Sequence, residues 1–271
     1  MHVLIIGFGE AGRAFSLGWH GGDAALTLTA HDRAQDGTRR TEFEAAARDR
    51  DVALVAHGAA SFAAADLVVS LVTADQALAV AREAAPHMKA GQMFLDFNSV
   101  APSTKRAAAQ IVRAGGADYL DVGVLGPVHP HLNRVPVALA GPDGEARARL
   151  AATLDLVVSH EYDEIGRAAE LKLLRSIVIK GVEGVVAEAL AACDAADMRD
   201  TVLASLAPSF PGIDWPRRAA YIEERITAHG ARRAAEMVEA SRMLRDMGLD
   251  PMVSEGVARR IAEAQARTPS S

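Results

Sequence analysis

The stretch Val3-Leu4-Ile5-Ile6-Gly7-Phe8-Gly9-Glu10-Ala11-Gly12 decides the fold of this chain. Its first four residues are a short apolar run of the kind that forms a buried strand. From Glu10 to Trp19 the apolar residues recur at helical spacing. Between these two patterns lies a G-x-G-x-x-G run, which joins a strand to a helix through a tight turn.

The three glycines of this run have three different expected roles. Gly7 allows the tight turn, Gly9 lets backbone N–H groups approach a pyrophosphate, and Gly12 lets the helix pack close to the strand. The N-terminus of the helix adds the positive end of its dipole. The run therefore predicts a dinucleotide site, although a turn that merely joins two elements is the alternative. The predicted cofactor contacts here are Gly7, Phe8, Gly9, Glu10, Ala11 and Gly12.

Asp32 and Arg33 follow the second expected strand, residues 25–30. A carboxylate at this position binds the ribose hydroxyls in the adenosine half of a dinucleotide. Asp32 favours NAD, because a carboxylate repels the 2′-phosphate of NADP. Arg33 keeps NADP open, because a guanidinium can clamp a phosphate or stack on adenine; a solvated loop charge is the alternative for it. We predict NAD or NADP as the cofactor, with NAD slightly favoured.

Alternating patterns organise the first part of the chain. Apolar strands are expected at residues 3–6, 25–30, 66–72, 92–97 and 118–124, with a last strand ending at residue 139. Helical patterns lie between them, at residues 10–19, 75–85 and 103–114. Strands that alternate with helices predict a parallel sheet with helices on both faces, the doubly wound α/β or Rossmann fold.

From about residue 163 the pattern is helical throughout. Helices are expected at residues 166–195, 217–247 (one or two helices) and 254–266, with Ser254 as an N-cap and a frayed tail from Thr268 to Ser271. A chain of 271 residues suits two domains. We therefore predict a cofactor-binding Rossmann domain over residues 1–162 and an all-helical domain over residues 163–271 for substrate binding and dimerisation.

Composition argues against several classes of protein. The formal net charge of −6 argues against a nucleic-acid binder, which usually carries a basic excess. The single cysteine, Cys193, cannot form a disulfide within the chain. No apolar run is long enough to cross a bilayer, and the apolar start lacks a basic leader. A cytoplasmic protein without a nucleic-acid or membrane partner is the expectation.

Polar residues follow two of the expected strands at the edge where ligands bind in open α/β sheets. Val72 and Thr73 end the strand at residues 66–72 and are predicted to border the cofactor. Asn98 and Ser99 follow the strand at residues 92–97 and can hold the nicotinamide carboxamide or substrate hydroxyls. A capping turn ahead of Pro102 is the alternative for this pair.

Several motifs, in chain order, resemble the β-hydroxyacid dehydrogenase superfamily, which includes 3-hydroxyisobutyrate and 6-phosphogluconate dehydrogenases. Besides the glycine run, residues 96–102 (D-F-N-S-V-A-P) resemble D-x-S-T-x-x-P. Residues 121–127 (D-V-G-V-L-G-P) resemble the substrate loop D-A-P-V-S-G-G, and residues 166–172 (G-R-A-A-E-L-K) resemble G-x-G-x-x-x-K with its catalytic lysine. Residues 232–237 (R-R-A-A-E-M) resemble a 6-phosphogluconate dehydrogenase-like branch with a C-terminal domain of unknown function.

The resemblance implies a dehydrogenase that transfers a hydride between a nicotinamide cofactor and a small hydroxylated acid or polar alcohol. It also implies a homodimer formed through the helical domain, in which alanine-rich faces such as residues 186–192 suit helix packing. The implied substrate-binding residues are Ser99, Gly123, Leu125, Gly126, His129 and Arg232.

Three positions depart from the superfamily's pattern. Leu125 stands where the better-known enzymes have a serine that helps to cradle a substrate carboxylate, and Pro127 replaces a glycine of the same loop. Ser176 stands where an asparagine is common, four residues after the lysine. Leucine has no side-chain hydrogen bond to offer and proline has no N–H. The substrate of a named member therefore does not transfer to this chain.

Lys172 is the predicted proton-transfer residue. Hydride transfer to or from a carbinol carbon needs a partner for the proton on oxygen, and a partly desolvated lysine can have a lowered pKa. Ser176 lies one turn further along the expected helix and would orient the same oxygen, whereas Lys180 on the same face is expected to have no such role. An exposed, solubilising charge is the alternative, but lysine is scarce in this chain, whose basic residues are mostly arginine.

His129-Pro130-His131 does not predict a metal site, because no acidic or cysteine partner lies at ligand spacing. His129 follows the substrate loop and is instead a candidate to replace the missing serine. In the helical domain, Arg232 or its neighbour Arg233 can bind an anionic substrate group. A solvated helix face is the alternative for these two arginines.

Two other functions stay open. An imine or carbonyl reductase on the same scaffold is the first; an acidic or aromatic proton donor would favour it, and Lys172 counts against it. A sensor that binds NAD(P) without turnover is the second, and the departure at Leu125 supports it. The sensor predicts cofactor binding that is indifferent to Lys172.

Overall fold

The computed structural model describes residues 1–22 and 25–266. The chain separates into two compact units, Met1–Lys172 and Leu173–Ser271. The predicted domain boundary at residue 162 is the last residue of the final strand, and the helix that continues past Lys172 begins at Arg167. The predicted tail, Thr268 to Ser271, lies outside the described residues.

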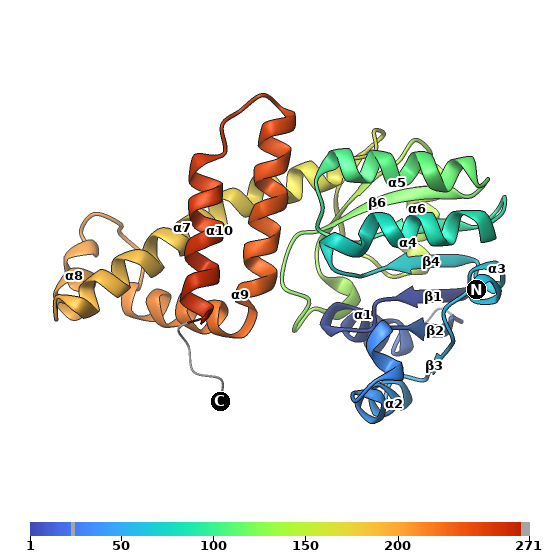
Figure 1. The fold of residues 1–271 in the computed structure, drawn as a ribbon, viewed down its shortest axis with the longest axis horizontal. Coiled ribbons are helices and arrows are strands. Elements are labelled where there is room, and N and C mark those ends of the chain that lie inside the picture. The colour runs from blue at the N-terminus through green and yellow to red at the C-terminus, as the bar shows by residue number, and fades with distance from the viewer. Residues whose placement is uncertain (23–24, 267–271) are drawn as a thin grey trace. The chain divides into compact units, whose positions relative to one another are not determined.

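An eight-stranded sheet forms the centre of the first unit, in the order β3-β2-β1-β4-β5-β6-β7-β8 (Figure 1). The strands are β1 (His2–Ile6), β2 (Thr27–His31), β3 (Val52–Leu54), β4 (Leu67–Ser70), β5 (Met93–Asp96), β6 (Asp118–Val124), β7 (Val137–Ala140) and β8 (Val158–Tyr162). Neighbours from β3 to β6 are parallel, β7 is antiparallel to β6, and β8 is parallel to β7. The strand order reverses between β1 and β4, the position at which open α/β sheets bind ligands. The predicted Rossmann arrangement is confirmed.

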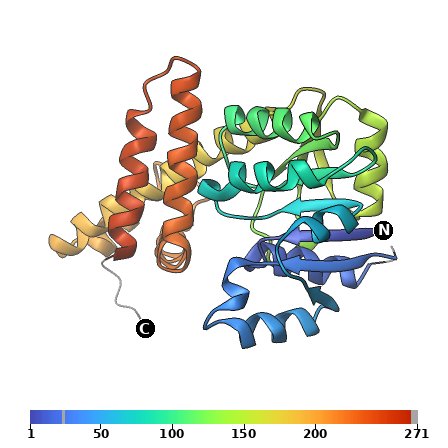
Figure 2. The same cartoon turned by 45° about the vertical axis from the view of Figure 1, so that its right-hand side comes forward.

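Helices cover both faces of this sheet (Figure 2). One apolar core contains residues of α1 (Glu10–His20), α2 (Arg40–Arg48) and α6 (Gly144–Thr153), and the other contains residues of α3 (Ala59–Ala64), α4 (Ala77–Ala84) and α5 (Pro102–Ala114). Val3 and Ile5 of β1 enter the first core, whereas Leu4 and Ile6 enter the second. A strand buried from both sides must be apolar at every position, which explains the continuous run at the N-terminus.

Two strands were not expected from the sequence. β3 has three residues, and β8 (Val-Ser-His-Glu-Tyr) exposes its three central positions at the end of the sheet. Neither strand has the apolar run that marks the buried strands. The expectation for Ser254 is also corrected: α10 begins at Met252, so Ser254 is a buried residue of the first turn and not the N-cap.

The second unit is helical. It holds the part of α7 (Arg167–Ala195) that follows Lys172, together with α8 (Arg199–Leu206), α9 (Trp215–Asp246) and α10 (Met252–Ala266). No strand occurs within residues 173–266, which confirms the predicted all-α domain. The long α9 is interrupted at His229, where φ is −140°. The apolar core of the second unit contains Ile222, Ile226, Met237, Val257 and Ile261, among others.

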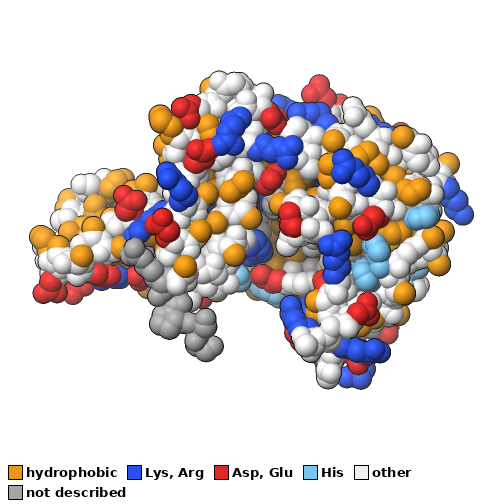
Figure 3. Space-filling view, viewed as in Figure 1, with side chains coloured by type: hydrophobic (Ala, Val, Ile, Leu, Met, Phe, Trp, Pro, Cys, Tyr) orange, Lys and Arg blue, Asp and Glu red, His pale blue; other side chains and the backbone are white. Residues whose placement is uncertain are grey.

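The surface carries charges of both signs. On the face shown in Figure 3, acidic and basic side chains are interspersed, in keeping with the modest formal net charge of −6. Over residues 1–22 and 25–266, no helix is long and apolar enough to cross a membrane.

Candidate active site

The glycine run forms the turn between β1 and α1, where the fold requires glycine at positions 7 and 12 but leaves open space at position 9. Gly7 has φ +94°, and a Cβ there would lie 2.5 Å from the Leu71 carbonyl oxygen. A Cβ on Gly12 would collide with the Gly7 carbonyl oxygen. A Cβ on Gly9 would meet nothing within 4 Å, and no side chain caps α1. Open space before an uncapped helix N-terminus fits a bound pyrophosphate.

Asp32 ties the end of β2 to this turn. One carboxylate oxygen accepts a hydrogen bond from Phe8 N at 2.8 Å, and the other accepts from Ala34 N at 2.9 Å. The half-buried carboxylate therefore sits beside the glycine turn, where the ribose of a dinucleotide would bind. Its neighbour Arg33 donates to Gln76 Oε1 at 2.6 Å and so bridges the loops that follow β2 and β4.

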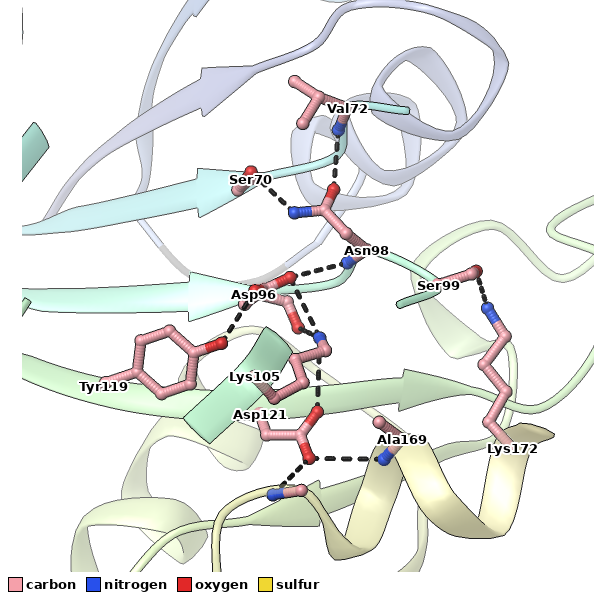
Figure 4. A network of polar contacts seen from close by, with 11 residues as sticks. Ser70, Val72, Asp96, Asn98, Ser99, Lys105, Tyr119, Asp121, Ala169 and Lys172 are labelled. Carbon is pink, nitrogen blue, oxygen red and sulfur yellow. Dashed lines mark hydrogen bonds and ion pairs between the residues drawn. The ribbon is translucent and has the colours of Figure 1, made fainter. Parts of the chain in front are cut away.

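Asn98 fixes the loop after β4 (Figure 4). Its Oδ1 accepts from Val72 N at 2.7 Å and its Nδ2 donates to Ser70 Oγ at 2.9 Å. Asn98 is buried, so both ends of its amide serve the protein's own chain. Thr73, at the start of the next turn, hydrogen-bonds Asp75 and contributes most to holding the pKa of that carboxyl below its ordinary value.

A buried polar network lies beneath these loops. Lys105 Nζ, on α5, lies 2.9 Å from Asp96 Oδ1 at the end of β5 and 3.2 Å from Asp121 Oδ1 on β6. Tyr119 donates its hydroxyl to Asp96 Oδ2 at 2.7 Å. The Lys105, Asp96 and Asp121 side chains have no exposed surface. Burial raises the pKa of the Asp121 carboxyl, and the Lys105 ammonium opposes that rise.

Asp121 also anchors the start of α7. Its Oδ2 accepts from Gly166 N at 3.0 Å and from Ala169 N at 3.2 Å. A carboxylate at a helix N-terminus satisfies N–H groups that have no partner within the helix. Lys172 follows Ala169 by one helical turn, and its Nζ donates to Ser99 Oγ (Figure 4). The structure thus brings together two predicted site residues that are far apart in the sequence.

In the loop after β6, both the backbone N–H and the side chain of Leu125 are occupied by contacts within the chain. Leu125 N donates to Pro136 O at 2.9 Å, and the half-buried Leu125 side chain packs with Ala138, Ala140 and Ala168. A Cβ on Gly123 would lie 2.6 Å from the Ala168 carbonyl oxygen, so glycine is needed where α7 begins. Gly126 is partly buried, and His129 is exposed. Within residues 1–22 and 25–266 no three His, Cys, Asp or Glu side chains are placed to share a metal ion.

Ser176 and Arg232 belong to the second unit. Ser176 Oγ donates to Glu236 Oε1 at 2.5 Å, and Lys180 Nζ lies 3.1 Å from the same carboxylate oxygen. Burial lowers the pKa of Lys180, and Glu236 opposes that change. Arg232 is exposed, whereas Arg233 is buried and paired with Glu183. The roles of Ser176 and Arg232 at a substrate stay predictions.

Sequence reasoning missed the buried network of Lys105, Tyr119 and Asp121, which lies beneath the loops of the candidate site. A signal was present in α5, where Lys105 falls in the buried stripe of Pro102, Thr104, Ala108, Ala109 and Val112. A charge at helical spacing among apolar residues indicates a buried ion pair, because a lone buried charge is costly.

Comparison with protein-family models finds two matches. The NAD binding domain of 6-phosphogluconate dehydrogenase matches residues 2–166, and a domain of unknown function (DUF1932) matches residues 194–264. The search of curated proteins gives no match.

Solved structures resemble the whole chain. A conserved hypothetical protein from Sinorhizobium meliloti 1021 is 35% identical, with coverage of 100% of this chain and 90% of that one and a TM-score of 0.75. The 3-hydroxyisobutyrate dehydrogenase of Mycobacterium tuberculosis is 16% identical, with coverage of 98% and 94% and a TM-score of 0.75. An imine reductase from Streptomyces aurantiacus is 23% identical, with coverage of 98% and 96% and a TM-score of 0.61. The last two show a shared fold.

The first family model spans more than half of the chain, and the second lies within the helical part that follows it. The motif at residues 7–12 forms the turn into α1, those at residues 96–102 and 121–127 begin in β5 and β6 and continue into the loops that follow, and that at residues 166–172 begins α7. The chain therefore belongs to the β-hydroxyacid dehydrogenase superfamily, in the branch that joins the NAD-binding domain of 6-phosphogluconate dehydrogenase to the C-terminal domain of unknown function.

Proposed function

We propose that this protein is an NAD(P)-dependent oxidoreductase that acts on a small hydroxylated acid or polar alcohol, with Lys172 as the general acid and base. The observation that carries the proposal is the contact between Lys172 Nζ and Ser99 Oγ, in the same unit as the glycine turn. An amine and a hydroxyl that meet at the carboxyl edge of a Rossmann sheet lie where a substrate oxygen would meet a bound nicotinamide.

A bound nicotinamide would supply the hydride acceptor for oxidation of the carbinol carbon and the hydride donor for the reverse reduction of the carbonyl carbon. The neutral amine of Lys172 takes the hydroxyl proton during oxidation, and the ammonium returns it during reduction. Ser99 Oγ accepts a hydrogen bond from the amine and orients it, and the turn from Gly7 to Gly12 would hold the pyrophosphate of the cofactor. The Asn98 amide keeps the loop after β4 in place.

The direct test is absorbance at 340 nm with purified protein, NAD and NADP in separate reactions, and a panel of hydroxy acids, polyols and cyclic imines. Turnover with a hydroxylated compound supports the proposal. Turnover with imines alone would identify a reductase. Cofactor binding without turnover across the panel would identify a sensor.

NAD is the proposed cofactor, because Asp32 is held beside the glycine turn by two backbone N–H groups. Asp32→Asn removes the negative charge while keeping an oxygen that can accept a hydrogen bond. We expect the ratio of NAD affinity to NADP affinity to fall by about tenfold, because repulsion of the 2′-phosphate is lost. Fluorescence titration with each cofactor measures the ratio. Asp36→Asn, at an exposed position of the 3₁₀ helix that Asp32 caps, is the control; an equal change in both variants would show that Asp32 does not select the cofactor.

A second copy of the chain is the proposed partner of the second unit. Leu174, Val178, Val182 and Val185 recur at helical spacing along α7 and are 44%, 67%, 44% and 64% exposed. Such an apolar stripe is typical of a helix that packs against another helix. We propose that this stripe, together with its equivalent in the second copy, forms the centre of a homodimer.

Val178→Glu is expected to convert the dimer to a monomer, because it places a charge in the centre of a desolvated interface. Light scattering coupled to size exclusion measures the mass. Val253→Glu changes a valine of α10 that is also 67% exposed and should leave the dimer intact. A wild-type monomer at micromolar concentration would refute the proposal.

A further inference from the structure

The ammonium group of Lys105 is buried between two carboxylates that serve different parts of the candidate site (Figure 4). Besides its ion pairs with Asp96 and Asp121, Nζ donates to the Asp96 carbonyl oxygen at 2.5 Å. Asp96 and Asp121 are register partners on the neighbouring parallel strands β5 and β6. One cation therefore holds together two carboxylates on adjacent strands, one at the end of β5 and the other in the middle of β6.

We propose that Lys105 is a positioning residue that sets the place of Lys172 relative to Ser99. This inference rests on the proposed role of Lys172 in proton transfer. Lys105 itself is fully buried and takes no part in the chemistry; it acts through Asp96 on one side and through Asp121 on the other.

On one side, Lys105 acts through Asp96 on the position of the loop that carries Ser99. Asp96 Oδ1 accepts a hydrogen bond from Asn98 N at 2.9 Å, and the same oxygen is paired with Lys105 Nζ. Ser99 is the next residue after Asn98. The Asn98 side chain continues the network to Val72 N. A shift of the Asp96 carboxylate would therefore move Ser99 together with the loop after β4.

On the other side, Lys105 acts through Asp121 on the position of the helix that carries Lys172. Asp121 Oδ1 faces Lys105 Nζ, while Oδ2 accepts from the N–H groups of Gly166 and Ala169. A rotation of this carboxylate would release the first turn of α7, which directly precedes the turn that carries Lys172. Both partners of the Lys172–Ser99 contact thus depend on one ammonium group.

A structural role alone does not account for a lysine at this position. Two buried carboxylates side by side repel each other, and one of them would take up a proton if no cation were present. A buried ion pair, however, stabilises a fold no better than apolar residues of the same volume, because desolvation costs as much as the attraction returns. What the lysine adds is a fixed distance between the two carboxylates.

Four variants distinguish an effect of Lys105 on the position of Lys172 from an effect on the stability of the fold. Lys105→Met removes the cation and leaves two buried carboxylates. Lys105→Met/Asp121→Asn restores the formal charge of the buried group and keeps an oxygen for Gly166 N and Ala169 N. Asp121→Asn alone keeps the cation. Tyr119→Phe is the matched control, because it removes a hydrogen bond from the same Asp96 carboxylate but leaves the ion pairs intact.

The first readout is independent of turnover. The chain has four lysines, Lys89, Lys105, Lys172 and Lys180, so brief acetylation followed by peptide mass spectrometry reports Lys172 against the exposed Lys89. In the double variant we expect a near wild-type melting temperature and several-fold faster acetylation of Lys172, because its amine is no longer held on Ser99.

The second readout is kcat, which is expected to fall about 100-fold, because small displacements of a proton-transfer group cost that much. Tyr119→Phe should lower the melting temperature without changing either readout.

A double variant with wild-type melting, kcat and Lys172 acetylation overturns the proposal, since neutralising charge would then be the whole role of Lys105. If the double variant does not fold, Lys172 acetylation and kcat are measured in Asp121→Asn instead. Faster acetylation and a lower kcat then support the proposal, and wild-type values overturn it. If the wild-type protein turns over no compound of the panel, the proposed function fails separately. In that case faster acetylation of Lys172 still supports the positioning role, and unchanged acetylation refutes it.

Discussion

Replacing Lys172 by Met is expected to lower kcat by about 10²- to 10⁴-fold, the range that a positioned general acid or base contributes. Methionine keeps most of the length and apolar bulk of the side chain but can neither accept nor donate the proton. Affinity for the cofactor should stay unchanged, because the glycine turn and Asp32 lie on other elements. Steady-state rates at 340 nm and fluorescence titration with NAD measure the two quantities.

Lys89→Met is the matched control for this variant. Lys89 is an exposed lysine of the same unit, in the loop before β5, and its loss should change neither rate nor affinity. Wild-type turnover in Lys172→Met would remove the residue from the mechanism, and a parallel loss of NAD affinity would assign it to binding instead.

The second large effect is expected in the glycine turn. Gly9→Ala should weaken cofactor binding without changing the fold, whereas Gly12→Ala should destabilise the fold. A Cβ at Gly9 enters open space, and the backbone there has φ −79°, which alanine adopts freely. The fold should therefore be intact, while the Kd for the cofactor rises by about 10- to 100-fold because the methyl group occupies the place of the pyrophosphate. Calorimetric titration with NAD measures this loss.

Gly12→Ala should destabilise the fold itself. Its Cβ collides with the Gly7 carbonyl oxygen, and backbone cannot move as a flexible side chain can. The free energy of unfolding should drop by about 1–3 kcal/mol, the usual cost of overpacking. Gly256→Ala on α10, where a Cβ meets nothing within 4 Å, is the control for both variants. Wild-type NAD affinity in Gly9→Ala would show that the pyrophosphate does not lie against this turn.

Sequence alone was enough for the elements that are buried on both sides. β1, β4, β5 and β6 are apolar runs bounded by turns, and their order with the intervening helices predicts the parallel sheet. β3 and β8 were not predicted, because a short strand and an exposed edge strand need no apolar run. They form through pairing with β2 and β7, which the local sequence does not show. Ser254 was misplaced because the serine, a common N-cap residue, lies two residues inside α10.

The candidate site divides in the same way. The glycine turn and Asp32 could be found because their chemistry is local and their spacing is fixed by one strand, one turn and one helix. The anchoring of α7 by Asp121 could not, because it joins residues 45 and 48 positions apart through a single carboxylate. The helical spacing of Lys105 within the buried stripe of α5 indicates that it is paired, but its partners Asp96 and Asp121 lie on two strands and are identified only once the helix packs against the sheet.

The buried trio of Asp96, Lys105 and Asp121 also has a consequence for how related chains can diverge. Loss of the Lys105 charge alone would leave two carboxylates side by side, without a cation, where no solvent can compensate their repulsion. Replacement of one aspartate, by contrast, leaves a single balanced ion pair, so the cost of a substitution differs among the three positions. In a relative with a neutral residue in place of Lys105, one of the two aspartates should have become neutral as well, and such paired replacements would mark lineages in which the site has been rebuilt for different chemistry.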